Sequence, residues 1–90
     1  MSNGMALHQN SDVIAKRLDQ TSVLVHIPTN RIFELNETGS RVWEMIGERL
    51  NADQIVQRLA DEYHVEEGQA AGEVNELLTR LRNEGLISSS

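Results

Sequence analysis

The chain has 90 residues, no cysteine and a formal net charge of −6. This length fits one small domain, and the lack of cysteine excludes disulfides and thiolate metal sites. No apolar run approaches the ~20 residues that span a membrane, and the polar first residues lack the apolar segment of a signal peptide. We therefore expect a cytoplasmic protein without membrane contacts.

The acidic charge lies in the second part of the sequence. Residues 1–35 carry three basic and three acidic side chains, whereas residues 36–90 carry five basic and eleven acidic ones. Because an acidic surface repels phosphate backbones, nucleic acid is not an expected partner.

The predicted domain covers residues 13–87. Residues 1–12 are expected to be a disordered or tag-derived N-terminal segment, and residues 88–90 a loose tail, because termini without contacts usually fray. Three short runs of β-branched and apolar residues open the domain, and turn residues separate them. They predict a three-stranded antiparallel sheet in hairpin order, with strands at Val13–Leu18, Ser22–Ile27 and Arg31–Leu35.

The third predicted strand leads directly into a helix. Asn36 is a natural N-cap, and Glu37 suits the positive end of the helix dipole. Val42, Trp43 and Ile46 then recur at helical spacing. Large apolar residues in so small a domain usually lie in the core, and Trp43 is expected there.

Helical spacing continues to the end of the domain. Gly85 is expected to close the last helix in the left-handed conformation. The helices are predicted at Glu37–Arg49, from the N-cap Asn51 to the residue before His64, and at Glu67–Glu84. The predicted fold is therefore α+β, an N-terminal three-stranded antiparallel sheet followed by a three-helix bundle, with a winged-helix-like arrangement.

The sequence contains no catalytic or metal-binding pattern. His8, His26 and His64 are far apart and have no partner four residues away. The acidic pairs Asp61-Glu62 and Glu66-Glu67 lack the spacing and glycine of a calcium loop. We expect no enzymatic activity, no metal and no cofactor.

A three-stranded sheet has two edges, and an uncovered edge offers unpaired N–H and C=O groups to another strand. The groove between the third strand and the third helix is a candidate site for an extended peptide. The alternative is that the N-terminal segment or a second copy covers this edge, so a homodimer stays open.

The segment from Pro28 to Glu44, PTNRIFELNETGSRVWE, resembles the PqqD-like family, the pyrroloquinoline-quinone biosynthesis protein D-like proteins. The shared pattern is a strand ending in aromatic-x-Leu-Asn-x-Thr-Gly, followed by Val-Trp in a helix. The similarity continues through Ala52–Val65, Val74–Leu81 and Gly85-Leu86-Ile87, and it covers about residues 13–87.

The resemblance implies a recognition element for ribosomally made, post-translationally modified peptides. Such domains bind the leader of a precursor peptide as an added strand and act as non-catalytic peptide chaperones. They present the peptide to a modifying enzyme, often a radical S-adenosylmethionine protein, or to a leader peptidase in lasso-peptide systems. The resemblance does not assign this chain to pyrroloquinoline-quinone biosynthesis or to another pathway.

The family's binding site maps onto one strand and one helix flank of this sequence. Ile32 and Leu77 are predicted to form apolar side-chain pockets, and Glu34, Glu73 and Arg80 to select charge. The full predicted site comprises Arg31, Ile32, Phe33, Glu34 and Leu35 on the strand, and Glu73, Leu77, Arg80 and Leu81 on the helix.

Two alternative functions remain open at this point. The three helices permit a winged-helix DNA-binding regulator, although residues 66–84 carry five acidic and two basic side chains where a recognition helix should be basic. The chain could also be a structural subunit that completes the sheet of an enzyme.

Overall fold

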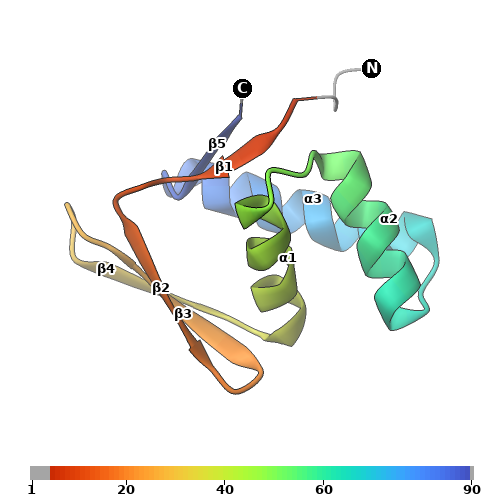
Figure 1. Ribbon diagram of the computed structural model, residues 1–90, viewed down its shortest axis with the longest axis horizontal. Helices are drawn as coiled ribbons and strands as arrows, with labels where there is room; N and C mark the ends of the chain where they lie inside the picture. Colours follow the sequence, from red (N-terminus) through yellow and green to blue (C-terminus); the bar gives the residue numbers. More distant parts are fainter. Residues whose placement is uncertain (1–4, 90) are drawn as a thin grey trace.

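The structure is a computed structural model, and it describes residues 5–89. Helix α1 lies between the three-stranded sheet and α2 (Figure 1). The predicted α+β class is confirmed. In chain order the elements are β1 (Leu7–Gln9), β2 (Val13–Leu18), β3 (Thr21–His26), β4 (Arg31–Leu35), α1 (Glu37–Gly47), α2 (Ala52–Tyr63), α3 (Glu67–Asn83) and β5 (Ile87–Ser89).

The predicted sheet is present, with the order β2-β3-β4 and antiparallel pairing throughout. Leu18 pairs with Thr21, so β2 and β3 are joined by a two-residue turn in which Asp19 has φ 59°. The turn before β4 ends on Asn30 with φ 60°, a conformation that asparagine tolerates better than most residues. The hairpin order follows from these two turns, as the sequence predicted.

The two faces of this sheet differ in burial. The inner face packs toward α1, and its central side chains Leu24 and Leu35 are buried. The outer face keeps large apolar side chains exposed, among them Ile14 and Ile32. By strand alternation the outer face consists of Ile14, Lys16, Leu18, Thr21, Val23, Val25, Ile32 and Glu34.

The predicted capping residues occur where expected. The Asn36 side chain accepts a hydrogen bond from Gly39 N–H at the start of α1, and Asn51 forms a capping box with Gln54 at the start of α2. Gly85 follows α3 with φ 75°. Trp43 is 5% exposed and belongs to the core, as predicted.

The terminal segments correct two predictions. Residues 7–9 are not frayed, because β1 pairs antiparallel with β5 in a separate two-stranded sheet. Leu7 is 1% exposed within the core, and the Gln9 amide donates to Trp43 O at 2.8 Å. In the predicted loose tail, residues 88 and 89 instead belong to β5. Residues 1–4 and 90 lie outside the described residues.

An ion pair on the surface connects the first two helices. Arg41 on α1 donates from Nε and Nη2 to the two carboxylate oxygens of Glu62 on α2, each at 2.8 Å. The hydrogen bonds from Arg41 lower the pKa of the Glu62 carboxyl below its usual 4.5. The folded state therefore favours the charged carboxylate more strongly than the unfolded state does.

The burial of Leu7 predicts that β1 contributes to stability. Leu7→Ala should lower the free energy of unfolding by about 2–5 kcal/mol, because it removes buried methyl groups and leaves a cavity. Met5 is 52% exposed, so Met5→Ala should change it by less than about 0.5 kcal/mol. Urea unfolding monitored by Trp43 fluorescence measures both values. Equal stabilities of the two variants would contradict the packing of β1.

The Arg41–Glu62 pair predicts a pH-dependent loss of stability. Because the pKa of Glu62 is lowered in the folded state, its contribution is present above pH 4.5 and is lost as the pH falls through the folded-state pKa. Glu62→Gln should lower the free energy of unfolding at pH 7 by at most about 1 kcal/mol, since the pair is partly solvated. The difference from the parent protein should shrink below pH 4.5.

Glu76→Gln is the matched control for this measurement, because Glu76 lies outside the ion pairs found among the described residues. Urea unfolding at pH 7 and at pH values below 4.5 compares the variants. A difference for Glu62→Gln that stays constant with pH would show that the ion pair is not its source.

Candidate functional site

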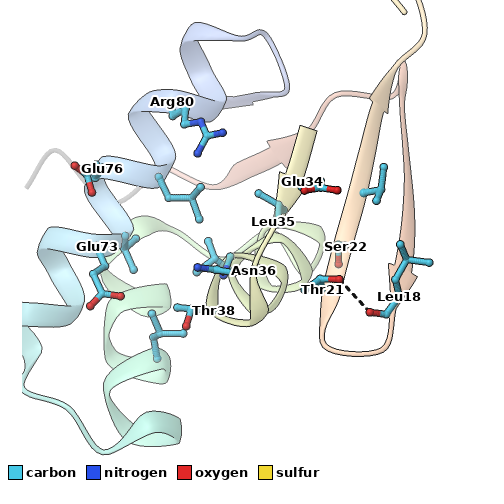
Figure 2. A pocket seen from close by; sticks show the side chains of 16 residues that line it. Leu18, Thr21, Ser22, Glu34, Leu35, Asn36, Thr38, Glu73, Glu76 and Arg80 are labelled. Carbon is cyan, nitrogen blue, oxygen red and sulfur yellow. Dashed lines mark hydrogen bonds between the residues drawn. The ribbon is translucent and has the colours of Figure 1, made fainter. Parts of the chain in front are cut away.

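A groove of about 770 Å³ lies between the C-terminal part of β4 and one flank of α3. Figure 2 shows Glu34 and Leu35 of β4 on one side and Glu73, Glu76 and Arg80 of α3 on the other. The groove continues past the end of β4 to the turn between β2 and β3. Its lining residues are Leu18, Thr21, Ser22, Val23, Glu34, Leu35, Asn36, Thr38, Gly39, Val42, Leu59, Glu73, Val74, Glu76, Leu77 and Arg80.

The lining of this groove combines an apolar floor with a charged rim. Its buried apolar members come from β4 and from all three helices, and Leu77 adds a half-buried side chain. The rim carries three carboxylates and one guanidinium, from Glu34, Glu73, Glu76 and Arg80. The groove can therefore bury an apolar side chain of a bound molecule on its floor, while the polar groups next to that side chain remain in water at the rim.

The main chain of β4 offers hydrogen-bonding groups at the edge of the sheet. Antiparallel pairs alternate between residues that bond to one neighbouring strand and residues that bond to the other side. Ile27, which directly follows β3, donates its N–H to Asp12 O at 3.0 Å. Counting back from Ile27, every second residue of β3 therefore directs its main-chain N–H and C=O groups toward β2, and the residues between them direct theirs toward β4. The β4 residues whose N–H and C=O groups point away from β3 are therefore Ile32 and Glu34.

The edge of β4 and the floor of the groove are joined by the turn into α1. Asn36 Oδ1 accepts from Gly39 N–H at 2.8 Å, and Asn36 O accepts from Ser40 N–H at 2.8 Å. A Cβ atom at Gly39 would lie 3.3 Å from Leu35 Cβ and 3.2 Å from Asn36 Oδ1. Glycine at this position therefore lets the first turn of the helix approach the end of the strand closely.

The other end of β4 is tied to the end of α3. Arg31 Nη1 lies 2.6 Å from Glu84 Oε1, and the Arg31 guanidinium carbon lies 5.2 Å from the Phe33 ring centroid. None of these three residues lines the groove. The pair thus marks the end of the groove, which is open beside Glu34 and Leu35.

The structure brings together five of the nine predicted site residues. Glu34, Leu35, Glu73, Leu77 and Arg80 line the groove. The predicted apolar pocket at Leu77 thus coincides with the groove, and the three residues predicted to select charge stand on its rim.

The other four predicted residues lie elsewhere. Leu81 is 2% exposed and belongs to the core together with Val74 and Leu78. Ile32 is 66% exposed on the outer face of the sheet and does not line the groove. Arg31 and Phe33 contact each other beyond the end of the groove.

Sequence reasoning missed several lining residues. Three of them could have been predicted from the strand-to-helix motif, which directly follows the strand of the site: Asn36, Thr38 and Gly39. No sequence pattern indicates the others, because their approach to β4 depends on tertiary packing. They are Leu59, Glu76 and the residues beside the turn between β2 and β3.

Other kinds of site are not apparent in the described part of the chain. Residues 5–89 contain no group of three or more His, Cys, Asp or Glu side chains that could hold a metal ion. His26 Nδ1 lies 2.7 Å from Thr29 Oγ1, so this histidine at the end of β3 contacts the turn before β4. Within the same residues, every helix is too short or too polar to cross a bilayer.

The fold and the groove define a small α+β domain in which an open sheet edge stands beside a helix. The sequence profile of the family described as Coenzyme PQQ synthesis protein D (PqqD) matches residues 21–87. The chain belongs to this family, which confirms the resemblance found in the sequence. No curated protein matches the chain.

Two solved structures are similar to this chain. TbiB1 in complex with the TbiA(beta) leader peptide has a TM-score of 0.84 and 27% sequence identity, covering 90% of this chain and 94% of that chain. A lasso peptide synthetase B1 complexed with the leader peptide has a TM-score of 0.82 and 20% identity, covering 92% of this chain and 98% of that chain. The second match shows the shared fold.

The cap at Asn36 predicts a measurable loss when it is removed. Asn36→Ala should lower the free energy of unfolding by about 1 kcal/mol, because Gly39 N–H loses its acceptor. Asn36→Asp keeps an acceptor at the same place and should retain most of the stability. Urea unfolding of both variants tests this, and equal losses would assign the effect to something other than the cap.

Proposed function

We propose that this protein is a non-catalytic peptide chaperone that binds the leader of a ribosomally synthesised precursor peptide. The leader adds as a strand to the edge of β4, and its inward side chains enter the groove toward α3. The carrying observation is the edge of β4, which pairs with no further strand among residues 5–89, beside an apolar-floored groove of about 770 Å³. Strand addition uses main-chain hydrogen bonds for affinity and side-chain pockets for specificity.

The similar structures support this proposal. TbiB1 was solved with a leader peptide, and it matches 90% of this chain with a TM-score of 0.84. The partners that we propose are therefore a precursor peptide and the enzyme that acts on it, either a modifying enzyme such as a radical S-adenosylmethionine protein or a leader peptidase. The cytoplasmic location stays a prediction.

The DNA-binding alternative is not favoured by the surface of α3. Two carboxylates of this helix, Glu73 and Glu76, stand on the groove beside a single cation, Arg80. A helix that enters the major groove needs the opposite balance of charge.

The edge chemistry predicts the effect of proline at Glu34. Glu34→Pro removes an edge N–H and leaves the β3–β4 ladder intact, because edge strands accept proline where the N–H points outward. Loss of this hydrogen bond, about 0.5–1.5 kcal/mol, should weaken leader binding by about twofold to twelvefold. Glu34→Gln keeps this N–H. If main-chain hydrogen bonds dominate leader binding, its affinity for the leader should lie within a factor of about two of that of the parent protein.

The measurement is an NMR titration of the labelled protein with the leader peptide encoded beside it, with affinities from calorimetry. Binding should shift the resonances of Glu34, Leu35 and the α3 residues Glu73 to Arg80. Shifts confined to other surfaces would move the site, and no shift at millimolar peptide would contradict leader binding. Equal affinity of Glu34→Pro and the parent protein would argue against strand addition to β4.

A further inference from the structure

The outer face of the sheet has an apolar row that the proposed leader site does not use. Ile14 pairs with Val25, and Val25 pairs with Ile32, so these three side chains lie side by side across all three strands. Ile14 is 57% exposed and Ile32 is 66% exposed. Apolar side chains gathered on one face, unlike singly scattered ones, form a candidate surface for a partner.

The charge of this face distinguishes it from the rest of the molecule. The neighbouring row holds Lys16, Val23 and Glu34, so one positive and one negative side chain accompany the apolar residues. Val23 and Glu34 also line the groove, whereas Ile14, Val25 and Ile32 do not. Residues 36–90, which form the helices, carry eleven acidic and five basic side chains. The outer face is thus close to neutral, and an apolar, uncharged protein surface is its natural complement.

The size of this face argues against a second copy as the occupant. Three strands spaced about 4.8 Å apart, with side-chain rows about 7 Å apart, present only a few hundred Å². A stable interface buries about 800 Å² on each partner, and two chains of charge −6 also repel each other. The face alone is therefore too small to hold two copies together.

A bound leader would enlarge this face. Ile32 is one of the two residues whose main-chain groups point to the free edge, so an added strand lies directly beside it. Side chains on opposite strands point to the same face, and those of the leader opposite Ile32 would continue the row to a fourth strand. A partner that covers the outer face would then contact the protein and the leader together.

We infer that the outer face, centred on Ile14, Val25 and Ile32, is the docking surface for the enzyme that acts on the precursor peptide. This inference rests on the proposed leader binding and adds the surface by which the enzyme is recruited. The enzyme presents an apolar, uncharged patch to the sheet and binds more tightly once the leader strand is in place.

The test uses the double variant Ile14→Thr with Val25→Thr. Both substitutions keep a β-branched residue, and both positions lie away from the edge of β4. Met5→Thr is the control, because it also removes an exposed apolar side chain, 52% exposed, outside this sheet. The full-length protein, the leader-containing precursor and the enzyme encoded beside them are the components.

Two quantities separate this inference from the proposed function. Leader affinity by calorimetry should be the same for the parent protein, the double variant and Met5→Thr. The concentration of protein that gives half-maximal conversion of the precursor by the enzyme should rise about tenfold for the double variant alone, since lost apolar burial weakens docking.

Each outcome has a defined meaning. Normal leader affinity with unchanged conversion would overturn the docking surface and leave leader binding intact. Absence of leader binding by the parent protein would overturn both. Sedimentation velocity without partners should give a monomer, and a dimer that dissociates in the double variant would show that a second copy covers this face.

Discussion

The turn from β4 into α1 is the constraint on which the groove depends. The Asn36 side chain holds Gly39 N–H, and the buried Ser40 side chain donates to Leu35 O at 3.4 Å. These contacts fix the direction of α1 relative to β4, and α1 runs beneath the inner face of the sheet. Because α1 covers that face and not the edge of β4, the edge stays open beside α3.

The β1–β5 ribbon has a complementary role on another side of the molecule. Leu7 N–H donates to Leu50 O at 3.3 Å, and Asn10 N–H donates to Leu86 O at 2.9 Å. These bonds hold the first strand against the end of the helical part instead of against β4. A terminal strand is the simplest cover for a sheet edge within one chain, and here it is occupied elsewhere.

The sequence predicted those features that local interactions determine. Asn36, Asn51 and Gly85 act within a few residues of their own positions, so the helix ends could be located from residue type. The ribbon could not, because β1 and β5 have three residues each and their pairing joins the two ends of the chain. Strands so short have no readable alternation.

The difference between the predicted site and the lining of the groove has a similar cause. Leu77 and Leu81 are four residues apart and share one flank in a helical projection, yet only Leu77 lines the groove. Leu81 instead belongs with Val74 and Leu78 in the core. Helical spacing fixes which residues are neighbours, whereas the rotation of the helix about its axis depends on packing against α2.

The distribution of charge gives the open edge two different surroundings. Toward α3 an added strand meets a rim with Glu73 and Glu76 against Arg80. Toward the outer face it meets the apolar row that ends on Ile32. Because side chains of a strand alternate between the two faces, one extended segment addresses both surfaces at once. Residues at even and odd positions of a bound peptide would therefore be under separate constraints, the first set from the groove and the second from whatever covers the sheet.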